Sequence, residues 1–396
     1  MFQVLPATDA YLKHAYREIK GFEKEGEYRP CARMALKEII EGRLEEEIGE
    51  YLELDPYERS QIRLDYRNGS YIRHLLTELG DLEIKVPRLR KRCFKFTILE
   101  SYSRRTREVD KLILNCFVYG HSTRKVSEAL LPLLGEKVSS STVSRVSRCL
   151  DRAVEAFHKR GILDGYRFLY FDGVVLKSRY GGKVHKKSIL CAYGITRYGI
   201  AEMIDFLPSR GETQEAWEGF LNDLLERGLE CENTELIITD GGKGLHSALE
   251  VVLPRQKRQR CWAHKARNVL DKAKMKDHDA MKKGLSRIWN AKDLQTATKA
   301  YWEFVKRYRQ KYPKAVKCLE KDCEELLAFY QVKQRDVWSK IRTTNPIERA
   351  FREVKRRTRP MGVFANLQSI ERIIYAIFES LNRNWKLRPF KTFTQH

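Results

Sequence analysis

The chain has 396 residues, of which 42% are hydrophobic, and a formal net charge of +23 at pH 7. This length exceeds a typical single domain and predicts two or three folded units with a sizeable core. No apolar run approaches the roughly 18 residues that span a bilayer, and the N-terminal residues do not form a signal peptide, so we expect neither a membrane protein nor a secreted one.

Cysteine content and charge distribution indicate the cellular compartment and the kind of partner. The nine cysteines are odd in number and include no Cys-x-x-Cys pair, so we expect a reduced cytoplasmic compartment rather than a disulfide framework or a zinc ribbon. Residues 1–60 hold 9 Lys and Arg against 14 Asp and Glu, whereas residues 251–314 hold 19 against 5. Such a local excess indicates nucleic acid as partner, with a merely basic surface as the alternative.

The N-terminal part of the chain predicts a helical region followed by a small β unit. Residues 1–60 predict a helical N-terminal region, clearest at 32–52, with a scaffolding or oligomer-contact role. Residues 61–110 predict a small basic β unit, because Asn68-Gly69 is a turn signal and apolar residues alternate with polar ones before Pro87. The stretch after Pro87 interleaves basic residues with two phenylalanines, which suits either a phosphate contact or a charge-protected edge strand.

Residues 111–162 predict a helix-turn-helix DNA-binding region. Ser122 and Gly135 bound a first amphipathic helix, and the serines after the turn cap a second helix that buries apolar residues as far as Phe157. The polar face of the second helix carries two arginines that would contact DNA, Arg145 and Arg148. An ordinary pair of packed helices is the alternative, since nothing in the pattern itself demands DNA.

Residues 163–396 predict a ribonuclease H-like α/β catalytic core. Three consecutive strands are followed by helix, strand and helix, and these elements are expected at 167–179, 188–196, 200–208, 213–228, 235–240 and 243–253. Residues of about 265–340 are basic and lack strand-like runs, so they predict an all-helical insertion. Two further helices close the chain.

Two aspartates in this region stand where a metal site is expected. Asp172 lies within an apolar run, and a carboxylate desolvated in a strand requires a cation or donors, although Asp-Gly is equally a hairpin signal. Asp240 follows an apolar run and precedes two glycines, which places it where α/β sheets bind ligands. A turn aspartate that accepts backbone hydrogen bonds is the alternative there.

A third acid and a Cys-x-x-His pair complete the candidates. Asn345 suits a helix N-cap and Pro346 the first helical position, so spacing alone favours Glu348 as the partner in a capping box. Cys261 and His264 have no second ligand pair at zinc-finger spacing, so structural zinc is not expected. Positioning near the site, or plain packing for Cys261, is the remaining interpretation.

Together these segments resemble the Mutator-type transposases of prokaryotic insertion sequences. The resemblance covers about residues 60 to 385 and rests on FDGVVLKSR, IITDGGKGLHSAL, RCWAHKARNVL and TTNPIERAFREVKRRTRPMGVF, in family order. It implies that Asp172, Asp240 and Glu348 form a catalytic acidic triad and that a helical insertion precedes Glu348. Gly242 and Ala365 depart from the residues frequent in the family, and neither departure touches the acids.

The resemblance also implies the chemistry and the partners. The acids would bind two Mg²⁺ ions, for which Mn²⁺ can substitute, and would cleave DNA at terminal inverted repeats and transfer the strand into target DNA. A nucleoid-associated homo-oligomer, at least a dimer on DNA, is expected. Besides Arg145 and Arg148, the expected DNA contacts are Cys261, His264, Lys265, Arg267, Arg342, Arg349, Arg356 and Arg357.

Two other classes share part of these features. A non-mobile sequence-specific DNA-binding protein would keep the basic charge and the helix-turn-helix but would not need three acids. A ribonuclease H-like nuclease or resolvase would need the acids but no region specific for repeat ends. Metal-dependent cleavage separates the first alternative from a transposase, and strand transfer separates the second.

Overall fold

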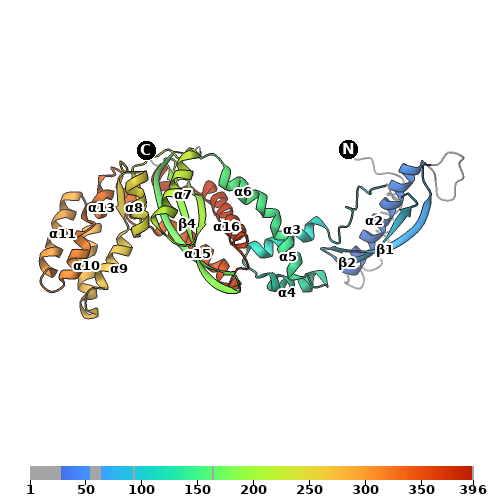
Figure 1. Ribbon diagram of the computed structural model, residues 1–396, viewed down its shortest axis with the longest axis horizontal. Helices are drawn as coiled ribbons and strands as arrows, with labels where there is room; N and C mark the ends of the chain where they lie inside the picture. The colour runs from blue at the N-terminus through green and yellow to red at the C-terminus, as the bar shows by residue number, and fades with distance from the viewer. Residues whose placement is uncertain (1–27, 54–63, 92–93, 163–164, 395–396) are drawn as a thin grey trace. The chain divides into compact units, whose positions relative to one another are not determined.

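A computed structural model describes residues 28–53, 64–91, 94–162 and 165–394 (Figure 1). The chain divides into two compact units, Met1–Ser147 and Arg148–His396, and each is described by itself. Across the described ranges, no helix is both long and apolar enough to cross a bilayer. Residues 1–27 and 54–60 of the predicted N-terminal region, and residues 92–93 of the predicted basic stretch after Pro87, lie outside the described residues.

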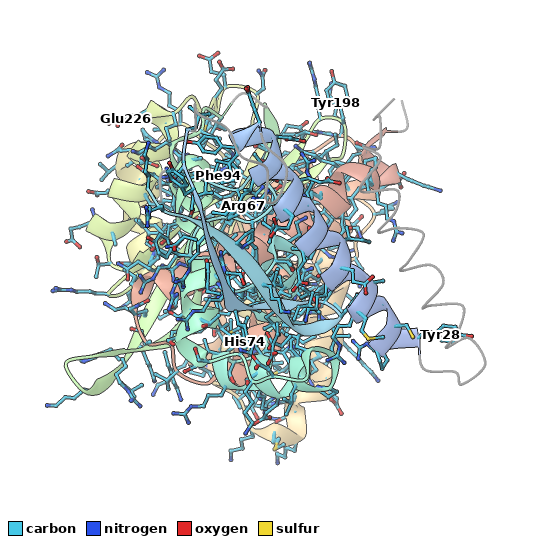
Figure 2. All side chains as sticks on the ribbon, turned by 90° about the vertical axis from the view of Figure 1, so that its right-hand side faces the viewer. Tyr28, Arg67, His74, Phe94, Tyr198 and Glu226 are labelled. Carbon is cyan, nitrogen blue, oxygen red and sulfur yellow. The ribbon has the colours of Figure 1, made fainter. Side chains whose placement is uncertain are left out.

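The first unit opens with a helix packed on an antiparallel hairpin, formed by α2 (Tyr28–Leu52), β1 (Arg67–Thr77) and β2 (Gly80–Leu89). Leu82, Ile84 and Val86 are buried against this helix, which confirms the predicted alternation. Arg67 and His74 are labelled on β1 in Figure 2. The helix at 32–52 is confirmed as part of α2.

The turn expected at Asn68-Gly69 is wrong. Gly69 has a φ of +66° and lies inside β1, where the register shifts between Arg67 and Ser70. A bulge uses the same left-handed conformation as a tight turn, so the sequence signal alone does not separate them. The strands instead reverse just before Gly80, which pairs with Thr77.

Three helices that pack against one another complete the first unit: α3 (Arg107–Val118), α4 (Thr123–Leu134) and α5 (Ser140–Ser147). The predicted caps are confirmed, since the Ser122 hydroxyl accepts from the Lys125 N–H and Gly135 has a φ of +73°. The prediction of one continuous helix to Phe157 is wrong. The chain forms a 3₁₀ turn at Arg148–Leu150 and restarts as α6 (Asp151–Lys159), both in the second unit.

A mixed five-stranded sheet forms the centre of the second unit, with strands β3 (Tyr166–Tyr180), β4 (Lys183–Thr196), β5 (Ala201–Ser209), β6 (Leu236–Thr239) and β7 (Arg258–Arg260). The order is β5-β4-β3-β6-β7; the first three are antiparallel, and β6 and β7 run parallel to β3. This arrangement agrees with the predicted α/β core. No local pattern predicts β7, which is short and entirely polar.

Helices cover the sheet on both sides. Leu169 and Phe171 of β3 pack against α7 (Gln214–Glu226) and α8 (Lys243–Val252). Because successive side chains of a strand alternate, Tyr170 faces the other way, where its neighbour Tyr193 meets Trp385 of α16 (Leu367–Leu387). Asp172 follows in the same alternation, so it belongs to the α16 side.

The segment from β7 to the next core helix is helical, as predicted for 265–340. Its helices are α9 (Trp262–Leu270), α10 (His278–Trp289), α11 (Leu294–Tyr308), α12 (Pro313–Glu320), α13 (Cys323–Leu327) and α14 (Trp338–Ile341). It also contains 3₁₀ turns at Met275–Asp277, Ala328–Gln331 and Arg335–Val337. The helix α15 (Asn345–Thr358) then returns the chain to β3. A 3₁₀ turn (Arg359–Met361) precedes α16, and α17 (Lys391–Thr394) follows it.

Candidate active site

Asp172 is a strand residue rather than a turn residue. It pairs with Cys191 of β4, and the β3–β4 reversal lies at Gly181-Gly182, so the hairpin alternative at Asp172 is wrong. The carboxylate is half-buried and accepts from the N–H of Gly173 at 2.7 Å. Burial, followed by the charge of Asp240, raises the pKa of Asp172 to about 7.

Asp240 occupies the neighbouring position on the sheet. The last parallel pair of β3 and β6 is Phe171 with Thr239, so Asp172 and Asp240 follow it on adjacent strands. The Asp240 carboxylate also accepts from the N–H of Gly242 at 2.8 Å, so the turn interpretation holds alongside the site interpretation. One carboxylate therefore shapes the turn and still carries charge beside Asp172.

Gly241 makes this turn possible. Its φ is +81°, which disfavours any residue with a side chain. A Cβ atom at this position would lie 0.7 Å from Nη1 of Arg260, so the Arg260 guanidinium occupies the space that a side chain would need. The first glycine of the Asp-Gly-Gly sequence is thus explained by backbone conformation and by close packing.

Glu348 lies in the first turn of α15, but the capping box predicted from spacing is wrong. The N-cap is Thr344, and the N–H of Asn345 donates to the Thr343 hydroxyl instead of to Glu348. Glu348 Oε1 accepts from the Thr344 hydroxyl at 3.0 Å and lies 3.8 Å from Nδ1 of His264. The carboxylate is therefore not held by a backbone amide, and about a third of its surface stays open.

The Cys-x-x-His pair ties Glu348 to the rest of the site. The buried Cys261 sulfur accepts from the N–H of Thr344 at 3.3 Å and also lies 3.3 Å from the Thr344 hydroxyl, and His264 Nδ1 lies 3.4 Å from that hydroxyl. Burial raises the pKa of the Cys261 thiol, but hydrogen bonds from His264 and Thr344 outweigh it and lower the pKa overall. The hydrogen bond to Cys261 raises the pKa of His264. The pair positions the start of α15.

A fourth carboxylate, Glu212, was not anticipated from the sequence. It lies in the loop before α7 and hydrogen-bonds with Ser188, and burial followed by the charge of Asp240 raises its pKa. A Cβ on Gly173 would lie 2.5 Å from its Oε1, and one on Gly244 would lie 2.2 Å from its carbonyl oxygen. The signal in the sequence is indirect, because these two glycines stand far from it along the chain.

The carboxylates interact through space, and their charges are only partly compensated. Besides Asp240, the negative charge of Glu348 raises the pKa of Asp172, and the charge of His264 lowers it. Among the residues that the structure describes, no three His, Cys, Asp or Glu side chains are placed to hold one metal ion by themselves. A cation bound here would need further ligands from substrate or water.

The predicted DNA contacts differ in accessibility. Cys261, Lys265 and Arg357 are buried, and the Lys265 ammonium pairs with Asp322 and donates to the Cys318 carbonyl, so direct DNA contact does not fit these three. The half-buried members are His264 and Arg342, whose guanidinium donates to Trp289 and Asn290. The exposed members are Arg145, Arg148, Arg267, Arg349 and Arg356.

Comparison with known proteins shows the family to which the chain belongs. Residues 10–388 match the family described as "Transposase, Mutator family". The chain is 30% identical over 364 residues to the transposase for insertion sequence element IS905 of Lactococcus lactis, covering 92% of both chains. It is 34% identical to the transposase for IS256 in transposon Tn4001 of Staphylococcus aureus, covering 86% of this chain and 87% of that one. It is 30% identical to the transposase for ISRM5 of Rhizobium meliloti, covering 90% and 88%. The chain belongs to the Mutator family of transposases.

Proposed function

We propose that this transposase cleaves DNA at the ends of its element and joins them to a target with Asp172, Asp240 and Glu348. The observation that carries the proposal is that the pKa of one half-buried aspartate is raised by both of the other acids. These acids come from β3, from the end of β6 and from α15. Their electrostatic interaction, with the charges only partly compensated, supports a cation site over a structural cluster.

The donor set fits a hard divalent ion, Mg²⁺ with Mn²⁺ as a substitute. Carboxylate oxygens are the ligands that Mg²⁺ prefers, and it takes few of them from protein. Asp172 would hold two ions, with Asp240 and Glu348 each completing one set, so no ion needs three protein ligands. When bound, such ions activate the attacking oxygen and stabilise the leaving oxygen of a phosphodiester.

The residues of the chain prepare this site in two ways. Asp172 must lose its proton before it can ligate a cation, and its pKa of about 7 means that the carboxylate predominates only above neutral pH. The Thr344 hydroxyl orients Glu348. Water as the attacking group would give cleavage, and a DNA 3′ hydroxyl would give strand transfer, so one site serves both steps.

We assign the sheet to the ribonuclease H-like fold. Three antiparallel strands followed by two parallel ones, with an acid on β3 and another directly after β6, support the assignment. The helices from α9 to α14 would be the insertion that precedes the third acid. The predicted boundaries 61–110, 111–162 and 163–396 remain part of the proposal.

The regions before the sheet would recognise the terminal inverted repeats. α4 and α5 pack together as a helix pair, and the exposed Arg145 on α5 would contact DNA as part of a helix-turn-helix. Bringing two ends together would require at least a dimer on DNA. Replacing Arg145 with Ala should weaken binding to repeat DNA more than binding to unrelated DNA, and an unchanged footprint on the repeat would contradict the assignment.

Cleavage of a duplex carrying the inverted repeat that flanks the gene, with Mg²⁺ present, tests the catalytic proposal. Asp172→Asn, Asp240→Asn and Glu348→Gln should each abolish cleavage and strand transfer while repeat binding survives. Glu226→Gln is the matched control, because this carboxylate is exposed at the end of α7 and does not affect the pKa of Asp172 (Glu226 is labelled in Figure 2). Strand transfer retained in any of the three variants removes that residue from the site, and cleavage without strand transfer in the parent protein would indicate a nuclease.

A further inference from the structure

We infer that a basic two-stranded ribbon next to the active site, residues 175–187, binds the phosphate backbone of the target duplex. β3 and β4 continue past the rest of the sheet, because β6 pairs with β3 only as far as Phe171 and β5 pairs with β4 only from Ser188 onward. The strands close at Gly181-Gly182, where φ is +56° and +78°, as a two-residue hairpin turn requires. The ribbon belongs to the green β3–β4 hairpin in Figure 1.

One face of the ribbon is packed and the other is open. Leu176 and Ser178 are buried, and the backbone of β3 pairs with Phe364 through two hydrogen bonds of 2.8 and 2.9 Å. The alternate residues Lys177 and Arg179 point to the opposite face and are exposed. The packed face holds the ribbon in place, so the exposed face is a fixed surface.

The exposed face is strongly cationic and has no internal counter-charge. Its basic side chains are Lys177, Arg179 and Lys186, since Lys183 and Lys187 alternate to the other face, and residues 173–187 contain no Asp or Glu. Lys177 stands directly opposite Lys186 across the two strands, and like charges at that spacing are destabilising. No Lys or Arg of the ribbon forms an ion pair with any residue of the described ranges. An anion that binds both strands would relieve this repulsion.

Protection of an exposed strand edge is the simpler role for such charges, but it does not account for the basic residues of β3. Lysines discourage edge-to-edge pairing when they lie on a free edge. The outer edge of β3 at Lys177 and Arg179 is already paired with Phe364, so their charges are not needed there. A ligand explains their position on the exposed face.

The chemistry of the face favours a phosphate backbone over base edges. Its other exposed side chains are Val175 and Val184, and residues 173–187 contain no Asn or Gln to read a base. A partner bound without regard to sequence fits target DNA, whereas a terminal repeat must be recognised by sequence. This choice of target rests on the proposed function.

The position of the ribbon also fits a duplex that passes the active site. Lys177 lies five residues beyond Asp172, which is roughly 17 Å along an extended strand, or about half a turn of B-DNA. Alternation turns Lys177 to the other side of the strand from Asp172. The ribbon would therefore hold phosphates at a distance from the reacting one, and its charges should matter for target capture and not for the cleavage step.

The test uses a double variant that carries both Lys177→Gln and Lys186→Gln (the Gln pair). Its matched control is a double variant in which the same two lysines are replaced by Arg (the Arg pair). End cleavage, joining of a pre-cleaved end to a target, and affinity for a duplex without the repeat are measured with the full chain between 50 and 200 mM salt. The Gln pair should lower joining at least about tenfold and reduce the salt slope of duplex binding by about two, since each phosphate contact contributes about 0.9. Cleavage should stay within about twofold, and the Arg pair should behave as the parent.

Three results would overturn the inference: unchanged joining with an unchanged salt slope, an equal loss of cleavage and joining, or no recovery in the Arg pair. The second would assign the ribbon to the element's own end. If the parent protein neither cleaves nor joins, the proposed function fails instead. The salt slope for the duplex without the repeat still decides whether the ribbon binds a phosphate backbone.

Discussion

Replacing Asp172 by Asn should make the metal-free protein more stable, although it should abolish cleavage. The carboxylate is half-buried beside other acids, and burial first and then the charge of Asp240 raise its pKa from the ordinary 3.8 to about 7. A group placed in this way costs folding free energy whenever it is ionised. The isosteric amide keeps the shape of the side chain and removes that cost.

The sign and size of the effect follow from linkage. Because the folded protein holds this proton more tightly than the unfolded chain, stability falls as pH rises from about 4 to about 7. The full penalty above pH 7 is about 4 kcal/mol as an upper limit, and water at the partly open carboxylate reduces it. At pH 5 the penalty is only about 1–2 kcal/mol, since the unfolded chain has ionised and the folded one has not.

Urea unfolding of the parent and the Asp172→Asn variant, with a chelator present at pH 5 and at pH 8, measures this penalty. The variant should be more stable at both values, and its advantage should grow from pH 5 to pH 8. Adding Mg²⁺ at pH 8 should stabilise the parent and leave the variant nearly unchanged, because a bound cation offsets the repulsion. The Glu226→Gln variant should be as stable as the parent at both pH values, and Mg²⁺ should stabilise it as much as it stabilises the parent.

Equal stability of the two proteins at pH 8, or an advantage that is larger at pH 5, would refute the reasoning. Either result would mean that the Asp172 carboxylate is well solvated or already neutralised by the protein. A variant less stable than the parent at both pH values would show that the carboxylate accepts structural hydrogen bonds that the amide cannot replace.

Three further substitutions test contacts around the site. Thr344→Val removes the hydroxyl that donates to Glu348, so the cleavage rate should fall about tenfold to a hundredfold in single-turnover assays while DNA affinity holds. Lys265→Ala removes the ammonium that pairs with the half-buried Asp322 carboxylate and leaves it only Arg260 at 3.6 Å, so it should cost about 1–3 kcal/mol in urea unfolding, with part recovered when Asp322 is also replaced by Ala. Gly244→Ala would bring a Cβ within 2.2 Å of a backbone carbonyl oxygen and should cost about 1–3 kcal/mol; an unchanged melting temperature would contradict that close approach.

The sequence was informative where apolar periodicity was strong and ambiguous where one signal serves two structures. Asp-Gly fits a tight turn and a strand equally well, and only the pairing of β3 with β4 as far as Tyr180 decides that Asp172 is in a strand. Spacing suggested a capping box at Glu348, because it could not show that the residue before Asn345 is the N-cap. Neither the polar strand β7 nor Glu212 produces a local pattern, since their positions depend on tertiary contacts.

The contacts of Cys261 explain how Glu348 stays in register with acids on the sheet although a long helical segment separates them. The Cys261 N–H donates to the Thr239 carbonyl at the end of β6, and its sulfur accepts from Thr344 at the start of α15. Thr344 in turn donates to Glu348. This route from the sheet to the third acid bypasses every helix from α10 to α14. The contact of Cys261 with Thr344 therefore ties the start of α15, and with it Glu348, directly to the end of β6.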